Sequence, residues 1–208
     1  MGSPAPILYL HGFASSPASK KATFFQDKFG PRLCVPDLVG EDFYGMTLTA
    51  QLEVIGRKAG EGPVDLMGSS MGGYLAALFA AANPGKVRKV VLLAPAFDFA
   101  NRWAGALGEA AVADWRATGS MAVFHYGWRR QARVGWQLFE DSLLHQPFPA
   151  VTQPVLIFHG VDDAVVPVSL SVEFARRTPG AILHQLPSDH ELIDVLDFLW
   201  AEAGPFLA

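Results

Sequence analysis

The sequence predicts an α/β protein built on a parallel sheet, and three observations favour this fold class. Short apolar runs of strand length alternate with longer segments of helical periodicity, as in repeated β/α units. The pentapeptide Gly68-Ser69-Ser70-Met71-Gly72 lies where one strand run passes directly into a helix run. The chain has 208 residues, half of them hydrophobic, which suffices for one domain with a sizeable core.

The predicted elements follow one another in β/α order. Short apolar runs predict six strands, near residues 6–10, 32–35, 64–68, 88–94, 154–159 and 181–186. Helical patterns predict five helices, near residues 18–29, 47–60, 71–83, 168–177 and 190–203. Crossovers between parallel strands are right-handed, so we expect helices on both faces of the sheet.

One segment does not fit this alternation. From about residue 96 to residue 150 no strand is predicted, although a crossover needs only a dozen or so residues. The segment has a helical patch from Trp128 to Leu144. We interpret residues 96–150 as a helical cap over the carboxyl edge of the sheet, inserted in a single domain of residues 1–208. Three of its arginines, Arg129, Arg130 and Arg133, form a positive cluster that is either a solvated helix face or an anion-steering site.

The cap is rich in aromatic residues, including four of the five tryptophans. A cap in this place faces the sheet edge where ligands bind in open parallel sheets. These aromatics therefore either line a substrate pocket or only pack the cap against the body. The tentative pocket residues here are Phe97, Trp103, Trp128 and Trp136.

Ser70 is the candidate nucleophile, because its surroundings have the G-x-S-x-G pattern of a nucleophile elbow. Gly68 and Gly72 lack the Cβ atoms that would collide where strand and helix close together. The serine hydroxyl is then left at the tip of the turn. The alternative is an ordinary turn serine, since a bare G-x-S-x-G also occurs by chance.

His190 is the candidate base, in a loop just past the last predicted strand. Imidazole has an unperturbed pKa of roughly 6.5, so it both accepts and returns a proton near neutral pH. His184 is an alternative but lies within a strand, and His159 is expected to brace a turn. His125 and His145 are disfavoured because they precede the acid in the chain, whereas an elbow serine of this kind is followed first by its acid and then by its histidine.

Asp163 is the candidate acid that orients the imidazole and stabilises its charged form. It lies in a Gly/Asp turn after the strand near residues 154–159. The neighbouring Asp162 is an alternative that we expect to cap the turn instead. Asp189 is a poorer candidate, because adjacent side chains rarely point at each other.

Four stretches together resemble the α/β-hydrolase serine esterases. They are His11-Gly12-Phe13, Gly68 to Gly73, His159-Gly160-x-x-Asp163-x-x-Val166-Pro167 and Asp189-His190. The resemblance implies an α/β-hydrolase fold, trimmed of two leading antiparallel strands, with about six mostly parallel strands, helices on both faces and a helical cap insertion. The run from His11 to Pro17, with Ser19 and Lys20 after it, is similar to a branch of small bacterial esterases. Those esterases are often nearly capless, so the long insertion leaves the substrate preference open.

The oxyanion hole is expected to consist of two backbone N–H groups. One belongs to Met71, directly after the nucleophile, and the other to Phe13, in the loop after the first strand. Gly12 allows this loop to approach a substrate closely, so His11 and Gly12 are also tentative pocket residues. The alternative is a strand-ending turn that uses glycine only for its geometry.

The predicted activity is cleavage of a carboxylic ester with a small or medium apolar acyl group through an acyl-enzyme. A thioesterase, or an acyltransferase or perhydrolase, would use the same side chains. A ligand-binding protein without turnover is a further alternative, although no member of the triad is missing. A dehalogenase or epoxide hydrolase is disfavoured, because these call for an aspartate at position 70.

Composition limits the other possibilities. The net charge of −4 argues against nucleic acid as a partner, because phosphate binding needs a clustered positive surface. The single cysteine, Cys34, excludes an internal disulfide and is expected to pack on the second strand. Neither a metal site nor a dinucleotide or phosphate loop is visible, so we expect no cofactor. We expect no signal peptide, no membrane span and a cytoplasmic location. Whether Met1–Ser3 is native, and the oligomeric state, are left open.

Overall fold

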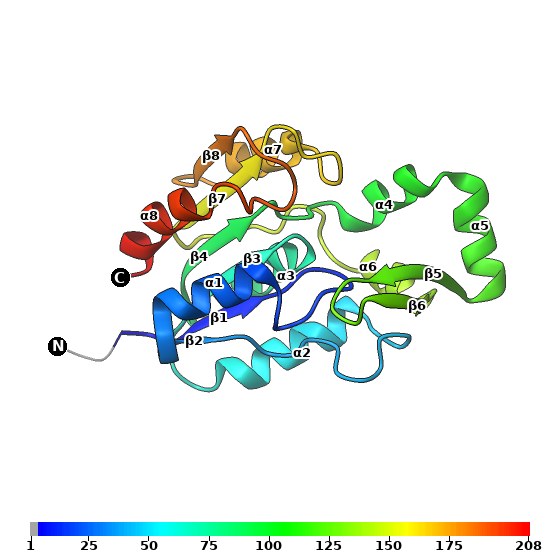
Figure 1. The fold of residues 1–208 in the computed structure, drawn as a ribbon, viewed down its shortest axis with the longest axis horizontal. Coiled ribbons are helices and arrows are strands. Elements are labelled where there is room, and N and C mark those ends of the chain that lie inside the picture. The colour runs from blue at the N-terminus through cyan, green and yellow to red at the C-terminus, as the bar shows by residue number, and fades with distance from the viewer. Residues whose placement is uncertain (1–3) are drawn as a thin grey trace.

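A six-stranded parallel sheet forms the centre of the computed structural model, which describes residues 4–208 (Figure 1). The strand order across the sheet is β2-β1-β3-β4-β7-β8, and every neighbouring pair is parallel. Residues 1–3 lie outside the described residues. The strands are β1 (Ile7–Leu10), β2 (Leu33–Cys34), β3 (Val64–Ser69), β4 (Val87–Leu93), β7 (Val155–Gly160) and β8 (Ile182–Leu186).

Helices cover both faces of this sheet, as predicted (Figure 1). One face packs against α1 (Lys20–Phe29) and α8 (Leu196–Leu207). The other packs against α2 (Leu48–Ala59), α3 (Met71–Ala82) and α7 (Val168–Arg177). None of the helices within residues 4–208 is long and apolar enough to cross a membrane. The α/β-hydrolase arrangement expected from the motifs is therefore the observed fold.

Two details of the main body differ from the predictions. The last helix begins at Leu196 and not near residue 190, because Leu192 adopts a left-handed φ of 54° that a helix does not accommodate. His190 consequently lies in a loop. Cys34 is on β2 as expected, but it is exposed and does not pack as a core residue.

The insertion between β4 and β7 contains helices and a β-hairpin, so the prediction that residues 96–150 hold no strand is wrong. Its elements are α4 (Phe99–Leu107), α5 (Glu109–Thr118), β5 (Ser120–His125), β6 (Arg130–Gly135) and α6 (Gln137–Ser142). β5 and β6 pair antiparallel with each other and not with the main sheet. The helical patch predicted from Trp128 is interrupted because Arg129 has a φ of 53°, which closes a tight turn before β6.

The cluster of Arg129, Arg130 and Arg133 therefore lies at a hairpin and not on a helix face. Arg133 bonds Ser120 across the hairpin with its Nε and Nη2 atoms, at 2.9 Å each. Met121 and Val123 of β5 pack toward the core, whereas Phe124 is largely exposed. The alternation of buried and exposed residues in β5 is the period of a half-buried strand.

Candidate active site

Ser70 sits on a strained turn between β3 and α3. Its φ of 55° and ψ of −120° lie outside the regions that non-glycine residues usually occupy. Such a conformation costs about 1–3 kcal/mol and persists only where neighbouring structure enforces it. Here the Ser70 amide donates to the Leu93 carbonyl of β4 at 2.9 Å, and its carbonyl accepts from the amides of Gly73 and Ala96. The turn exposes part of Ser70 at the carboxyl edge of the sheet, where the elbow motif predicts a nucleophile.

The glycines of the elbow are required by close backbone contacts. A Cβ atom at Gly68 would lie 2.2 Å from the Gly72 carbonyl oxygen. A Cβ atom at Gly72 would lie 2.1 Å from the carbonyl oxygen of Leu10 and 2.5 Å from that of His11. All three distances are far shorter than a real Cβ contact, and backbone atoms form the obstacle. Only glycine at these two positions permits strand, turn and helix to approach so closely.

Ser70, His190 and Asp163 are brought together into one hydrogen-bonded chain. His190 Nε2 is 3.0 Å from Ser70 Oγ, and His190 Nδ1 is 2.7 Å from Asp163 Oδ2. Because the ionised carboxylate only accepts, Nδ1 carries the proton, and Nε2 is free to accept one from the serine. The Asp163 side chain is fully buried and His190 is 14% exposed, so the chain runs from the interior to the surface.

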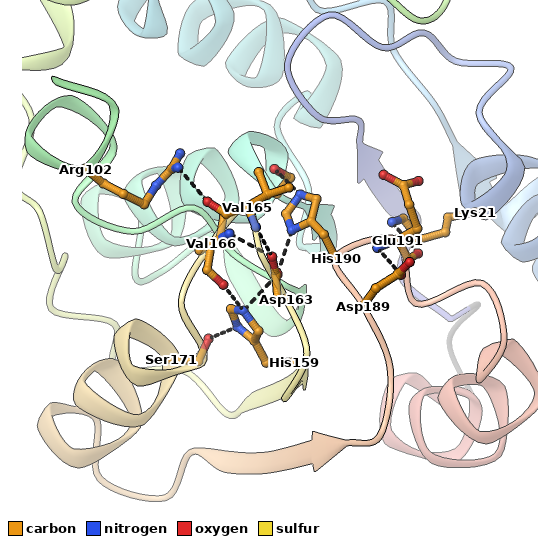
Figure 2. A network of polar contacts seen from close by, with 11 residues as sticks. Lys21, Arg102, His159, Asp163, Val165, Val166, Ser171, Asp189, His190 and Glu191 are labelled. Atoms are coloured by element: carbon orange, nitrogen blue, oxygen red, sulfur yellow. Dashed lines mark hydrogen bonds and ion pairs between the residues drawn. The ribbon is translucent and has the colours of Figure 1, made fainter. Parts of the chain in front are cut away.

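Four groups contact the Asp163 carboxylate, namely two backbone amides and two imidazoles (Figure 2). Its Oδ1 accepts from the amides of Val165 and Val166, at 2.8 and 2.7 Å. Its Oδ2 is 3.1 Å from His159 Nε2 in addition to the His190 contact. Burial opposes the charge of this carboxylate, but the hydrogen bonds from His159, His190 and Val166 outweigh it and hold the pKa of Asp163 well below its ordinary value. The group therefore stays ionised beside His190.

His159 braces the acid loop, as the sequence predicted, and in addition it contacts the acid itself. Its Nε2 is 2.9 Å from the Val166 carbonyl, which fixes the proton on that nitrogen. Its Nδ1 then accepts from the hydroxyl of Ser171 in α7 at 2.7 Å. The contact between His159 and Asp163 was not predicted, although the two residues share the quoted His-Gly-x-x-Asp stretch.

The alternative acids occupy other positions. Asp162 is exposed, and its amide, not its carboxylate, bonds the Ser188 carbonyl. Asp189 accepts from the Glu191 amide with Oδ1 at 2.8 Å, which stabilises the turn that carries His190. Neither carboxylate is bonded to His190.

The other histidines are also placed away from the serine. His184 stacks on Phe158 within the sheet, with ring centroids 5.3 Å apart. His125 stacks on Trp128 at the tip of the β5–β6 hairpin. His145 pairs with Asp141 beside α6.

The loop after β1, which contains the expected oxyanion donor Phe13, passes close to the serine at Gly12. A Cβ atom on Gly12 would lie 3.3 Å from Ser70 Cβ, so this loop passes directly over the nucleophile. Phe13 follows, with its ring packed against Trp103 and Phe43 at centroid distances of 5.0 and 5.5 Å. Met71 is the first residue of α3, so its amide is among the N–H groups that a helix leaves unsatisfied.

The tip of the β5–β6 hairpin is bonded to this same loop. The amides of Tyr126 and Gly127 both donate to the Ala14 carbonyl, at 2.8 and 3.3 Å. Gly127 also lies so close to Ser16 that a Cβ atom would be 2.8 Å from the Ser16 Cβ. The cap therefore contacts the segment that carries the Phe13 amide.

The tentative pocket residues separate into two groups. Trp103 touches the Phe13 ring, and Trp128 packs on Phe43 at the hairpin tip, so both lie near the loop after β1. Phe97 is fully buried in the body and stacks on Phe174, at 4.2 Å. Trp136 packs on Trp115 inside the cap.

His11 also lies inside the body. It is buried, and its Nδ1 is 3.1 Å from the Gly12 carbonyl. Burial lowers the pKa of its imidazole, which disfavours a charged His11 beside the loop. Within residues 4–208, no group of three or more His, Cys, Asp or Glu side chains is arranged to hold a metal ion.

Comparison with known sequences identifies related proteins. The model of an uncharacterised protein family, UPF0227, matches residues 6–203 of this chain. Mouse mitochondrial palmitoyl-protein thioesterase ABHD10 is 33% identical over 122 residues, which are 56% of this chain and 41% of that protein. The bovine protein of the same name is 31% identical over 145 residues, 66% of this chain and 47% of that protein. The chain thus spans less than half the length of the curated relatives it matches.

Solved structures share the fold at lower identity. Mouse alpha/beta hydrolase domain-containing protein 10 has a TM-score of 0.83 at 22% identity, covering 100% of this chain and 91% of that one. A putative hydrolase from Agrobacterium vitis has a TM-score of 0.84 at 23% identity, covering 99% and 88%. Est1E from Butyrivibrio proteoclasticus, solved with ferulic acid, has a TM-score of 0.75 at 19% identity, covering 98% and 88%. These similarities show a common architecture.

Proposed function

This chain belongs to the uncharacterised protein family UPF0227, within the α/β-hydrolase superfamily, and from that premise we propose that it is a serine hydrolase of carboxylic esters with small or medium apolar acyl groups. The observation that carries the proposal is the hydrogen-bonded chain from Ser70 through His190 to Asp163, with distances of 3.0 and 2.7 Å. An acid, a base and a hydroxyl in this order supply what nucleophilic acyl transfer requires.

The first half of the reaction forms an acyl-enzyme. Ser70 Oγ attacks the acyl carbon of the ester while its proton passes to His190 Nε2. The carbonyl oxygen becomes an oxyanion, which the backbone amides of Phe13 and Met71 stabilise in this proposal. Asp163, held ionised by its hydrogen bonds, stabilises the imidazolium. Collapse of the tetrahedral intermediate breaks the bond to the leaving oxygen, which takes the proton from His190 and departs as an alcohol.

The second half releases the acid. Water gives a proton to His190 Nε2 and attacks the acyl carbon of Ser70. The second tetrahedral intermediate then breaks the bond to Ser70 Oγ, which recovers its proton from His190. The carboxylic acid leaves and the serine is regenerated, so the cycle consumes only water.

Thioesters are the second candidate substrate class, and one observation favours them. The mouse relative of 33% identity is named a palmitoyl-protein thioesterase. The same side chains cleave a thioester, with a thiol in place of the alcohol as the leaving group. The aromatic rim formed by Phe13, Trp103 and Trp128 suits an apolar acyl chain in either case.

The test uses p-nitrophenyl esters and acyl thioesters of increasing acyl length, with a fluorophosphonate as a covalent label. We expect wild-type protein to turn over at least one series and to be labelled at Ser70. Ser70→Ala is expected to lose about 10⁴-fold or more in kcat and all labelling. Ser69→Ala is the matched control, because this neighbouring serine lies in β3 and is expected to leave both readouts in place. Wild-type protein inert to every substrate and to the label contradicts the proposal.

A further inference from the structure

Lys21 is a buried lysine that reaches the loop carrying His190. Its side chain comes from the first turn of α1, and only 7% of the residue is exposed. Its Nζ donates to the backbone carbonyl of Glu191 at 2.7 Å, a contact between residues 170 positions apart (Figure 2). Glu191 directly follows His190, so the bond acts one residue from the candidate base.

Burying this ammonium ion costs free energy, because its hydration is lost. Among residues 4–208 no carboxylate lies within 4.0 Å of Lys21 Nζ, so no ion pair compensates the lost hydration. Burial lowers the pKa of Lys21, and the nearby charges of Glu191, Asp189 and Asp163 partly oppose that shift. The preceding residue, Lys20, is also a lysine, but its side chain is exposed.

The loop from Ser188 to Leu192 has little regular structure to hold it. The Asp189 carboxylate bonds the Glu191 amide within the loop, and Leu192 has a φ of 54° that a leucine rarely adopts. Ser188 Oγ bonds Asp194 at 2.5 Å, and the Ser188 carbonyl accepts from the Asp162 amide. These contacts come from the same loop or from the acid loop beside it. Lys21 adds a contact from the far half of the sheet, on the segment that follows the Phe13 loop.

We propose that Lys21 is a positioning residue. It holds the His190 loop against α1, which follows the loop that contains Phe13, so that His190 stays within hydrogen-bond reach of Ser70. This inference rests on the proposed hydrolase function. The Lys21 ammonium contacts neither the serine nor the substrate, and it acts through the Glu191 carbonyl. A displacement of about 1 Å in a catalytic group can cost about 100-fold in rate.

The experiment compares Lys21→Met with Lys20→Met, the same change at the adjacent exposed lysine of α1. Steady-state kinetics with p-nitrophenyl butyrate are measured well below the melting temperature of each protein. We expect Lys21→Met to lower kcat by about 10- to 100-fold with KM changed less than about twofold, and to slow fluorophosphonate labelling by the same factor as kcat. Lys20→Met is expected to match the wild type in all three. Lys21→Arg, whose guanidinium can donate to the same carbonyl, is expected to recover part of the rate.

A general loss of structure is distinguished from positioning by the split between kcat and KM and by the arginine rescue. If Lys21→Met does not fold, a folded Lys21→Gln variant replaces it, with an expected loss of about fivefold or more because its shorter side chain falls short of the carbonyl. Turnover in a folded Lys21→Met or Lys21→Gln variant equal to that of Lys20→Met overturns this inference alone. A wild-type protein without turnover or labelling overturns the proposed function itself and this inference with it.

Discussion

The sheet edge that carries Ser70 and the cap that covers it are held together in different ways. At the sheet edge, the main contacts involve backbone atoms. The elbow glycines lie against carbonyl oxygens, and the Asp163 carboxylate accepts hydrogen bonds from two backbone amides. In the cap, side chains meet side chains. Trp115 is almost fully buried there and touches Trp103, Trp136 and Phe139. The first region tolerates almost no change of shape, whereas the second can be repacked with residues of similar volume.

This difference implies that the positions of the proposed nucleophile and acid depend less on the cap than the surroundings of a bound substrate do. The backbone contacts fix where Ser70 and Asp163, the proposed nucleophile and acid, stand. We propose that the aromatic residues of the cap form the apolar surroundings of the substrate. Substitutions at matched positions in the two regions therefore test whether the sheet edge is more constrained than the cap.

The largest effect is expected for Gly72→Ala at the elbow. The added Cβ would meet the Leu10 and His11 carbonyls at 2.1 and 2.5 Å, and these backbone atoms cannot move without opening the sheet. We expect a loss of about 4 kcal/mol or more in the free energy of unfolding, or no folded protein at all. Urea unfolding followed by tryptophan fluorescence measures it, and wild-type stability in this variant would show that the elbow is less constrained than the cap.

A smaller effect on activity is expected for His159→Gln. The change removes the imidazole that contacts Asp163 Oδ2 and the Val166 carbonyl, but it leaves the two amide bonds to Oδ1. We expect kcat for p-nitrophenyl butyrate to fall about tenfold. His184→Gln in the neighbouring strand is the matched control and should leave kcat unchanged, and equal rates in the two variants would exclude a role for His159 in holding the acid.

The charge of Asp163 predicts a pH-dependent effect on stability. Its pKa is lower in the folded protein, so its stabilisation is complete above its unfolded value of about 3.9 and is lost as the pH falls through the folded value. We expect the melting temperature of wild type to exceed that of Asp163→Asn by about 3–6 °C at pH 7, with the gap narrowing below about pH 4. The exposed Asp162→Asn serves as the control, and a gap that widens in acid would contradict the sign.

The smallest effect, of opposite sign, is expected for Gly105→Ala in the cap. Gly105 lies within α4, and no atom stands within 4 Å of the position its Cβ would take. Alanine favours the helix over glycine, so we expect a gain of about 0.5–1 kcal/mol and unchanged kcat. Urea unfolding measures it beside Gly72→Ala, and a destabilised Gly105→Ala would indicate that the cap is as constrained as the elbow.

The same difference explains which parts of the molecule could be predicted from the sequence. The elbow follows from its glycine spacing, which local backbone geometry demands. Asp163 and His190 were predicted from the chain order and motif spacing that the α/β-hydrolase resemblance implies. The β5–β6 hairpin could not be predicted in this way, because its strands pair only with each other and its turn depends on the left-handed Arg129. The contact of Lys21 was also missed, since a bond to a backbone carbonyl leaves no matching side chain to find.

The two hydrogen bonds from the hairpin tip to Ala14 have a consequence for substrate entry. A cap that moved away from the sheet edge would have to break both hydrogen bonds to the Ala14 carbonyl, next to Phe13. Movement of the cap would therefore also displace the Phe13 amide that we propose as an oxyanion donor. We therefore expect the substrate to enter without movement of the cap. A change to the length of the hairpin should alter turnover as well as the preference for acyl-chain length.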